Sequence, residues 1–143
     1  MAYATIADLR LRLSDLYTGV YTDESGAPMD DEAQADIDAA SAEIDTFLGA
    51  RYETPVTAPA VAALLKTWAV TLAEELAWSR SGKSETPKNV AARVANVRRI
   101  LQAIADARQS LPGAVERPAS SGGGIAFAQT EKPVFSREKL QGY

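Results

Sequence analysis

Cysteine and histidine are both absent from the 143-residue chain. Without cysteine the protein can form no disulfide, no thiolate metal site and no thiolate nucleophile. Without histidine it lacks the commonest general base and the commonest nitrogen ligand of metals. Serine-triad, cysteine-protease and zinc-hydrolase chemistry of the ordinary kinds are therefore excluded, and we expect neither a metal nor another cofactor.

Aromatic residues and long apolar runs are also scarce. Aromatic side chains make up 7% of the residues, while Ala, Leu and Val supply most of a hydrophobic content of 46%. This balance favours helices over a β-sandwich or barrel. No apolar run approaches the roughly 20 residues that span a bilayer, so we expect no contact with a membrane. The length fits one small domain with an appendage.

Acids that follow each other in the sequence do not indicate catalysis. Asp30 and Asp31 are adjacent, as are Glu74 and Glu75. Neighbouring residues on a helix point in different directions, so neither pair converges on one substrate. We interpret the first pair as helix-capping acids and expect one member of the second pair to be solvated. Since the chain offers no other convergent set, we predict that the protein is not an enzyme.

The segment from Tyr21 to Glu32 resembles part of a calcium-binding loop. An EF-hand loop needs oxygen ligands at its first and twelfth positions and Gly at its sixth. Gly26 and Glu32 match the sixth and twelfth positions, but Tyr21 replaces the essential first Asp and Met29 stands at another ligand position. We therefore interpret this segment as a glycine turn that leads into an acid-capped helix.

Apolar residues at helical spacing predict an all-α fold, a small bundle of about four helices with an extended C-terminal arm. The expected helices run from a Thr5 cap to a point before Gly19, from Asp30 or Asp31 to about Leu48, from Pro59 to a break at 81–85, and from Thr86-Pro87 to Leu111-Pro112-Gly113. Trp68 lies on the leucine stripe of the third helix, which we expect to be central, with Trp68 in the core. Trp78 falls off that stripe and is a candidate for a subunit boundary.

Charge is distributed unevenly along the chain. Residues 1–50 contain eleven acids and two arginines, a balance of −9, whereas residues 88–110 contain five basic residues and one acid, a balance of +4. Two interpretations stay open. The charges lie on solvated helix faces, or the acidic surface of one subunit packs on the basic surface of the next. The candidate inter-subunit charge contacts are Asp36, Asp38, Arg93, Arg98 and Arg99.

A patterned tail follows the helical part. The sequence predicts a helical body at 1–112, a Ser/Gly-rich linker at 113–130 and a docking arm at 131–143. The arm places Phe135, Leu140 and Tyr143 among charged residues, including Arg137. Apolar anchors of this kind are unusual in a segment that only stays solvated. We therefore predict that the arm binds a partner subunit.

Three segments together resemble a known family. They are Tyr3-Ala4-Thr5-Ile6-Ala7-Asp8-Leu9, then Asp38-Ala39-Ala40-Ser41-Ala42-Glu43-Ile44-Asp45-Thr46-Phe47-Leu48-Gly49-Ala50-Arg51-Tyr52, and finally Val134-Phe135-Ser136-Arg137-Glu138-Lys139-Leu140-Gln141-Gly142-Tyr143. In this order the chain resembles the Mu-like prophage head–tail connector proteins, which are small all-α phage proteins also called neck or adaptor proteins. The resemblance extends over nearly the whole chain. It departs from the family in the loop after Tyr21, which is less rich in Asp.

The resemblance implies a structural virion protein, made in the bacterial cytoplasm and placed at the head–tail junction. Such proteins form rings, most often of twelve copies, below the portal protein, and bind a downstream neck or tail terminator protein. DNA passes through the ring without sequence-specific binding. The arm would dock on the portal, with Phe135, Arg137, Leu140 and Tyr143 as anchors. The alternative is a small helical DNA-binding or regulatory protein that places the basic fourth helix on phosphates.

Overall fold

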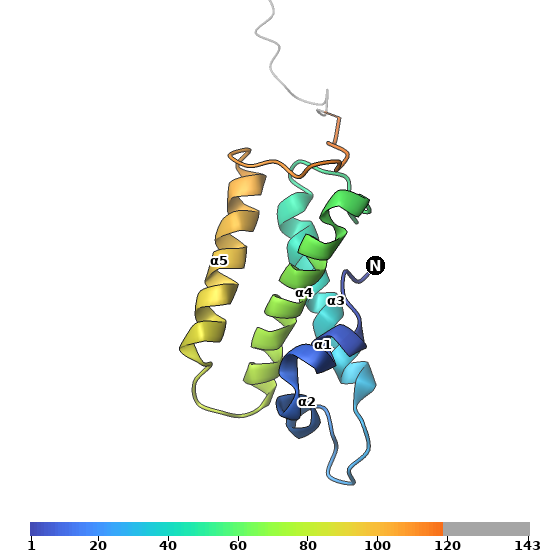
Figure 1. Cartoon of the computed structure of the whole chain (residues 1–143), viewed down its shortest axis with the longest axis vertical. Helices are drawn as coiled ribbons and strands as arrows, with labels where there is room; N and C mark the ends of the chain where they lie inside the picture. Colours follow the sequence, from blue (N-terminus) through green and yellow to red (C-terminus); the bar gives the residue numbers. More distant parts are fainter. Residues whose placement is uncertain (119–143) are drawn as a thin grey trace, which may run out of the picture.

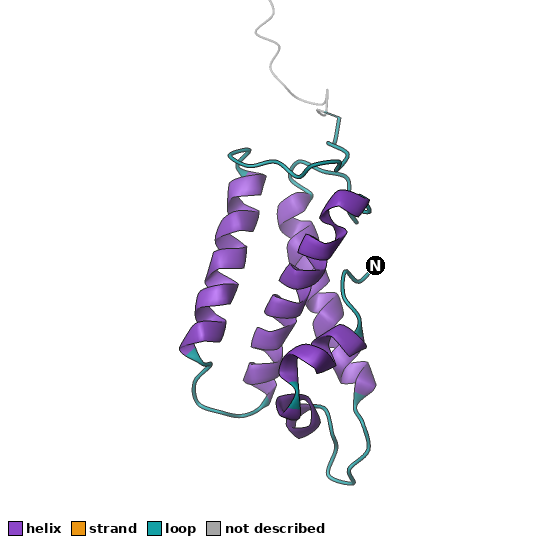
Figure 2. Cartoon of the chain, in the orientation of Figure 1, coloured by secondary structure: helices purple, strands orange, loops and turns teal. Residues whose placement is uncertain are grey.

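The computed structural model describes residues 1–118. Within them the chain forms five helices and two isolated β-bridges, as Figures 1 and 2 show. The helices are α1 (Ile6–Leu13), α2 (Asp15–Val20), α3 (Asp30–Leu48), α4 (Pro59–Arg80) and α5 (Lys88–Ala105). The all-α class is confirmed. The expected bundle of about four helices consists instead of three long helices and two short ones.

The long helices α3, α4 and α5 lie side by side, with α4 antiparallel to the other two (Figure 1). α4 packs against each of the other four helices and is therefore the central element, as predicted. Its buried stripe includes Leu65, Trp68 and Leu72, and Trp68 belongs to the core. Trp78 is only partly buried, and Lys83 Nζ lies 4.8 Å from the centroid of its indole ring. None of these helices is long and apolar enough to cross a membrane.

The first helical segment is divided, which corrects the expectation of one helix up to Gly19. Its start is as predicted, because Thr5 and Asp8 form a reciprocal capping box. α1 then ends at Leu13, and Ser14 adopts a positive φ of 49° before α2 begins. The turn at Ser14 brings two buried tyrosines inward, Tyr17 and Tyr21, whose ring centroids lie 4.9 Å apart. Burial of these rings outweighs the local preference for one continuous helix.

In the loop after α2, the side chain of Asp23 is hydrogen-bonded to the backbone of the loop itself. The Asp23 carboxylate accepts hydrogen bonds from the amides of Ser25 at 2.8 Å and Ala27 at 2.9 Å. Gly26 takes a φ of +84°, and Thr22 forms a bridge to Pro28. The loop is thus the glycine turn that the sequence predicted, and it leads into α3 at Asp30. Hydrogen bonds from Ser25 and Ala27 lower the pKa of Asp23.

The end of the described chain folds back along the loop after α3. α5 begins after Pro87 and ends at Ala105, earlier than the predicted end at Leu111-Pro112-Gly113. Leu111 returns to the core, where its amide donates to the Tyr52 hydroxyl at 3.0 Å. Beyond it the amide of Glu53 donates to the carbonyl of Val115 at 2.9 Å. Residues after Pro112 therefore still contact the bundle.

Candidate interaction surfaces

Arg98, one of the five predicted inter-subunit residues, binds two carboxylates of its own chain. From α5 its Nε donates to Oε1 of Glu43 on α3 at 2.7 Å, and its Nη2 donates to Oε2 of Glu75 on α4 at 2.7 Å. The hydrogen bonds that Arg98 donates to Glu43 and, next in effect, to Glu75 raise the pKa of Arg98 above its ordinary value. Arg98 therefore ties together the three long helices.

Arg93 makes a second link between α5 and α4. Its Nη2 lies 2.9 Å from Oε1 and 3.0 Å from Oε2 of the buried Glu74 carboxylate. Since Glu75 binds Arg98, both members of the adjacent acid pair are held by arginines of α5. We expected one of these two glutamates to be solvated. Neither is, because Glu74 is buried and Glu75 is partly buried and ion-paired. The pair serves helix packing.

Asp36 lies inside the subunit as well. It accepts hydrogen bonds from the buried Tyr21 hydroxyl at 2.6 Å and from Arg80 Nε at 2.6 Å, and Arg80 also reaches Glu32 at 3.0 Å. Burial, followed by the hydrogen bond to Asp36, raises the pKa of Tyr21. The group connects α2, α3 and α4 near the end of the bundle where α2 lies. Asp36 is 5% exposed and so presents almost no surface to another copy.

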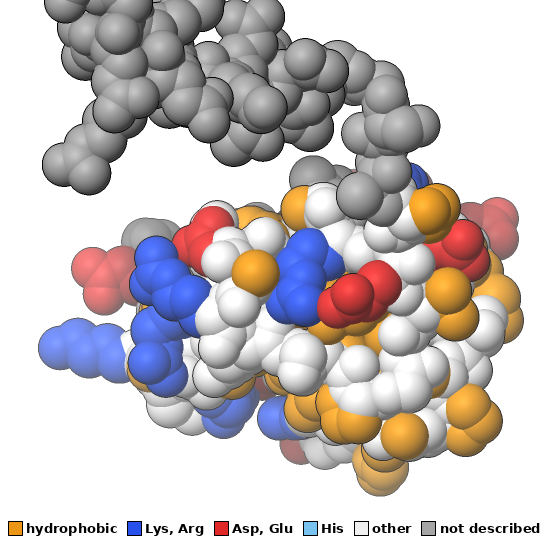
Figure 3. All heavy atoms as spheres, turned by 90° about the horizontal axis from the view of Figure 1, so that it is seen from above, with side chains coloured by type: hydrophobic (Ala, Val, Ile, Leu, Met, Phe, Trp, Pro, Cys, Tyr) orange, Lys and Arg blue, Asp and Glu red, His pale blue; other side chains and the backbone are white. Residues whose placement is uncertain are grey.

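Arg99 and Asp38 are the two predicted contact residues that form no ion pair within residues 1–118. Arg99 Nη2 donates to the side-chain oxygen of Asn96 at 2.7 Å, and Asp38 accepts from the side-chain amide of Gln34 at 2.9 Å. Their contact with other subunits stays a prediction. Seen from above, Lys and Arg gather on the side of α5, and hydrophobic side chains gather on the opposite side (Figure 3).

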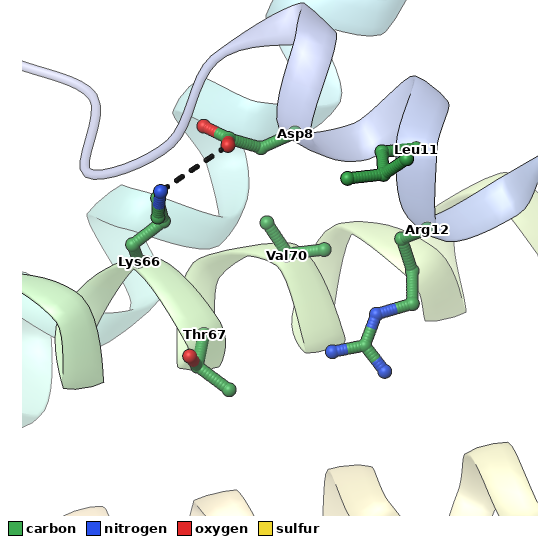
Figure 4. Close-up of a pocket in the computed structure, with 6 residues that line it drawn as sticks. All are labelled: Asp8, Leu11, Arg12, Lys66, Thr67 and Val70. Atoms are coloured by element: carbon green, nitrogen blue, oxygen red, sulfur yellow. Dashed lines mark hydrogen bonds and ion pairs between the residues drawn. The ribbon is translucent and has the colours of Figure 1, made fainter.

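An open hollow of about 390 Å³ lies between α1 and α4. It is lined by Asp8, Leu11, Arg12, Lys66, Thr67 and Val70, and we call it the α1/α4 groove. Figure 4 shows Leu11 and Val70 at its centre, the ion pair of Lys66 with Asp8 at one end and Arg12 at the other. Hydrogen bonds from Thr5, with a smaller effect of Lys66, lower the pKa of Asp8. The sequence signal for this groove was Leu11, an apolar residue off the buried stripe.

The described part of the chain contains no cluster of three or more acidic side chains placed to hold a metal ion. In this part of the chain, ion pairs hold the helices together. The exposed α1/α4 groove is a separate feature, with Arg12 at one end.

Two comparisons with known proteins bear on the kind of molecule this is. The family model described as Bacteriophage Mu, Gp36 matches residues 3–128. The chain is also 32% identical over 145 residues to Gene product J of Escherichia phage Mu, and the alignment covers 97% of each chain. The chain belongs to the Mu Gp36 family. The resemblance to Mu-like phage proteins, inferred from the three sequence segments, is thereby confirmed at the level of the phage family.

The match to the Mu Gp36 family extends beyond the helical body but ends before the predicted arm at 131–143. The family match continues ten residues past Pro118, and the alignment with Gene product J covers nearly all of the chain. The predicted anchors Phe135, Arg137, Leu140 and Tyr143 lie outside the described residues. Their docking role therefore stays a prediction.

Proposed function

We propose that this member of the Mu Gp36 family is a structural virion protein, a head–tail connector that forms a ring below the portal protein. The ring would consist of copies of this chain, most often twelve, and would continue the DNA channel towards a neck or tail terminator protein. The observation that carries the proposal is the alignment with a phage Mu protein, which covers 97% of each chain. The proposal includes no catalytic step, metal or cofactor.

The helical body is suited to a structural subunit because ion pairs between its helices make it rigid. Arg98 joins Glu43 and Glu75, so α3, α4 and α5 are held in register. The tail supplies a second attachment. A weak contact of the body and a weak contact of the arm strengthen each other when both bind one neighbour, because the second contact forms at high effective concentration.

The alternative, a DNA-binding or regulatory protein, draws less support from the same residues. It needs the arginines of α5 for phosphates, yet Arg93 and Arg98 are bound to carboxylates of their own chain. An arginine that gives up Glu74 or Glu43 for a phosphate leaves a partly buried carboxylate unpaired, which costs free energy. Of the three predicted arginines, Arg99 is bound only to a neutral side chain.

Electron microscopy of the protein mixed with the portal protein of the same phage tests the proposal. We expect a ring stacked on one end of the portal, with weak affinity for duplex DNA. A monomer or dimer that ignores the portal and binds DNA with an affinity that falls steeply with salt would overturn the connector function and support the alternative.

A further inference from the structure

The α1/α4 groove is an unpartnered apolar surface. Leu11 is 83% exposed at its centre, and Leu64, one turn before Thr67 on α4, is 42% exposed. Large apolar side chains exposed together beside a hollow indicate a binding surface. The groove also carries positive charge, because Arg12 forms no ion pair among residues 1–118.

We propose that the α1/α4 groove binds the outer face of α3 from a second copy of this chain. The inference rests on the proposed ring and names the two surfaces that would meet in it. We define the outer α3 face by its exposed residues, Ala35, Asp38, Ala39 and Ala42. This face combines small side chains with the exposed carboxylate of Asp38.

Charge complementarity is the first argument for this occupant. α3 contains no lysine or arginine, and within residues 1–118 the exposed Asp38 has only the neutral Gln34 as its side-chain hydrogen-bond partner. The groove offers Arg12 without an ion-pair partner, and Lys66 bound to Asp8 at 3.3 Å. Arg12 of one copy therefore gains a carboxylate in the contact, and Asp38 gains a cation.

Shape is the second argument. The alanines of the outer α3 face recur at steps of four and three, so they form one row along the helix and allow a close approach. Beside this row is a hollow of about 330 Å³, lined by Met1, Ala2, Asp38, Ser41, Ala42 and Asp45. The protruding Leu11 side chain of a second copy is small enough to enter such a hollow.

The two surfaces lie on different sides of the subunit. In Figure 1, α1 and the first half of α4 are in front, and α3 is behind them. A contact between two different surfaces leaves each copy with one free groove and one free α3 face, so it continues from copy to copy. Such a contact closes a ring when the rotation between copies is a whole fraction of a turn without a rise along the axis, and otherwise forms an open helix. A contact of the groove with itself would stop at a dimer.

Cross-linking through introduced cysteines tests the contact, since the natural chain has none. A protein with Leu11→Cys is mixed with one carrying Ala42→Cys and treated with a short bismaleimide. The matched control replaces Ala42→Cys by Ala95→Cys, another exposed alanine, on α5. We expect several-fold more dimer in the first mixture than in the control. Equal yields, or efficient dimers of Leu11→Cys alone, would overturn the proposal.

Charge reversal gives an independent readout. Arg12→Glu and Asp38→Arg should each weaken assembly, and the double variant should restore it, as measured by mass photometry. Arg99→Glu is the comparator. If it weakens assembly while Arg12→Glu does not, the contact of α5 predicted from sequence is right and the groove proposal is wrong. A third outcome is that Arg12→Glu loses DNA binding while the Leu11–Ala42 cross-link stays at the control level. The groove would then be a nucleic-acid surface, and the proposed contact between copies would be wrong.

Failure of this inference is distinct from failure of the connector function. A ring on the portal without the Leu11–Ala42 cross-link keeps the connector and removes this interface. A strong cross-link in a protein that never binds the portal keeps the interface and removes the connector.

Discussion

Arg98 is the residue whose loss should damage the fold most among the charged ones. From α5 it binds two carboxylates, Glu43 on α3 and Glu75 on α4, which would otherwise be left without this cation. Its side chain is 42% exposed, so water screens part of the interaction. We expect Arg98→Met to lower the free energy of unfolding by about 1–2 kcal/mol, measured by urea denaturation.

Arg99→Met is the matched control, because Arg99 is on the same helix but is bound only to Asn96. It should change stability by less than about 0.5 kcal/mol. Replacing Glu43 and Glu75 by glutamine in the Arg98→Met protein should recover part of the loss. Equal effects of the two arginine substitutions would show that the Arg98 ion pairs contribute nothing to stability.

Tyr21 makes stability depend on pH in the alkaline range. In the unfolded chain a tyrosine ionises near pH 10, but burial and Asp36 raise the pKa of Tyr21 in the folded protein. Above about pH 10 the folded state therefore holds a proton that the unfolded state releases, and stability falls as pH rises. Each such tyrosine contributes a slope of up to about 1.4 kcal/mol per pH unit.

Tyr21→Phe should therefore flatten the loss of stability between neutral and alkaline pH, measured by urea denaturation at several pH values. At pH 7 it should cost roughly 1–2 kcal/mol through the lost hydrogen bond to Asp36. Tyr3 has a raised pKa as well, chiefly from burial, so the slope should decrease without vanishing. An unchanged slope in Tyr21→Phe would contradict the assignment.

At the scale of elements, the junction of α1 and α2 contains strain that a single substitution can relieve. Ser14 has φ 49° and ψ −122°, a conformation that favours glycine, and its side chain makes no capping hydrogen bond. We expect Ser14→Gly to raise the free energy of unfolding by roughly 1 kcal/mol. Ser14→Ala, which keeps the strain, should leave it nearly unchanged. A Gly variant no more stable than the Ala variant would contradict this.

The junction also shows which elements the sequence can predict. The Thr5 cap, the start of α4 at Pro59 and the extent of α3 follow from signals within a few residues, and all three are as predicted. The turn at Ser14 depends on where Tyr17 and Tyr21 are buried, which local spacing does not contain. Serine is no helix breaker, and Gly19, the expected stop, lies exposed within α2.

The candidate contact residues show the same limit. The sequence identifies Asp36, Arg93 and Arg98 as charged residues on helices. It does not show whether such a residue pairs with an opposite charge in its own chain or in another subunit, because both kinds occupy the same positions along a helix. Which is true depends on the helix that lies opposite. Only the fold shows that Arg93 and Arg98 bind carboxylates of their own chain, and their contact with other subunits stays a prediction.

At the scale of the whole molecule, the body and the tail should be separable. Residues 1–118 contain a hydrophobic core, ion pairs between helices and a capping box of their own. A chain without residues 130–143 should therefore unfold at the same urea concentration as the full chain and yet lose binding to the portal protein in a pull-down.

Phe135→Ala and Tyr143→Ala should each weaken binding to the portal protein, because aromatic anchors contribute most to interfaces. Gln141→Ala is the control in the same segment and should bind normally. Unchanged portal binding by the shortened chain would exclude the tail as the docking arm and leave attachment to the helical body.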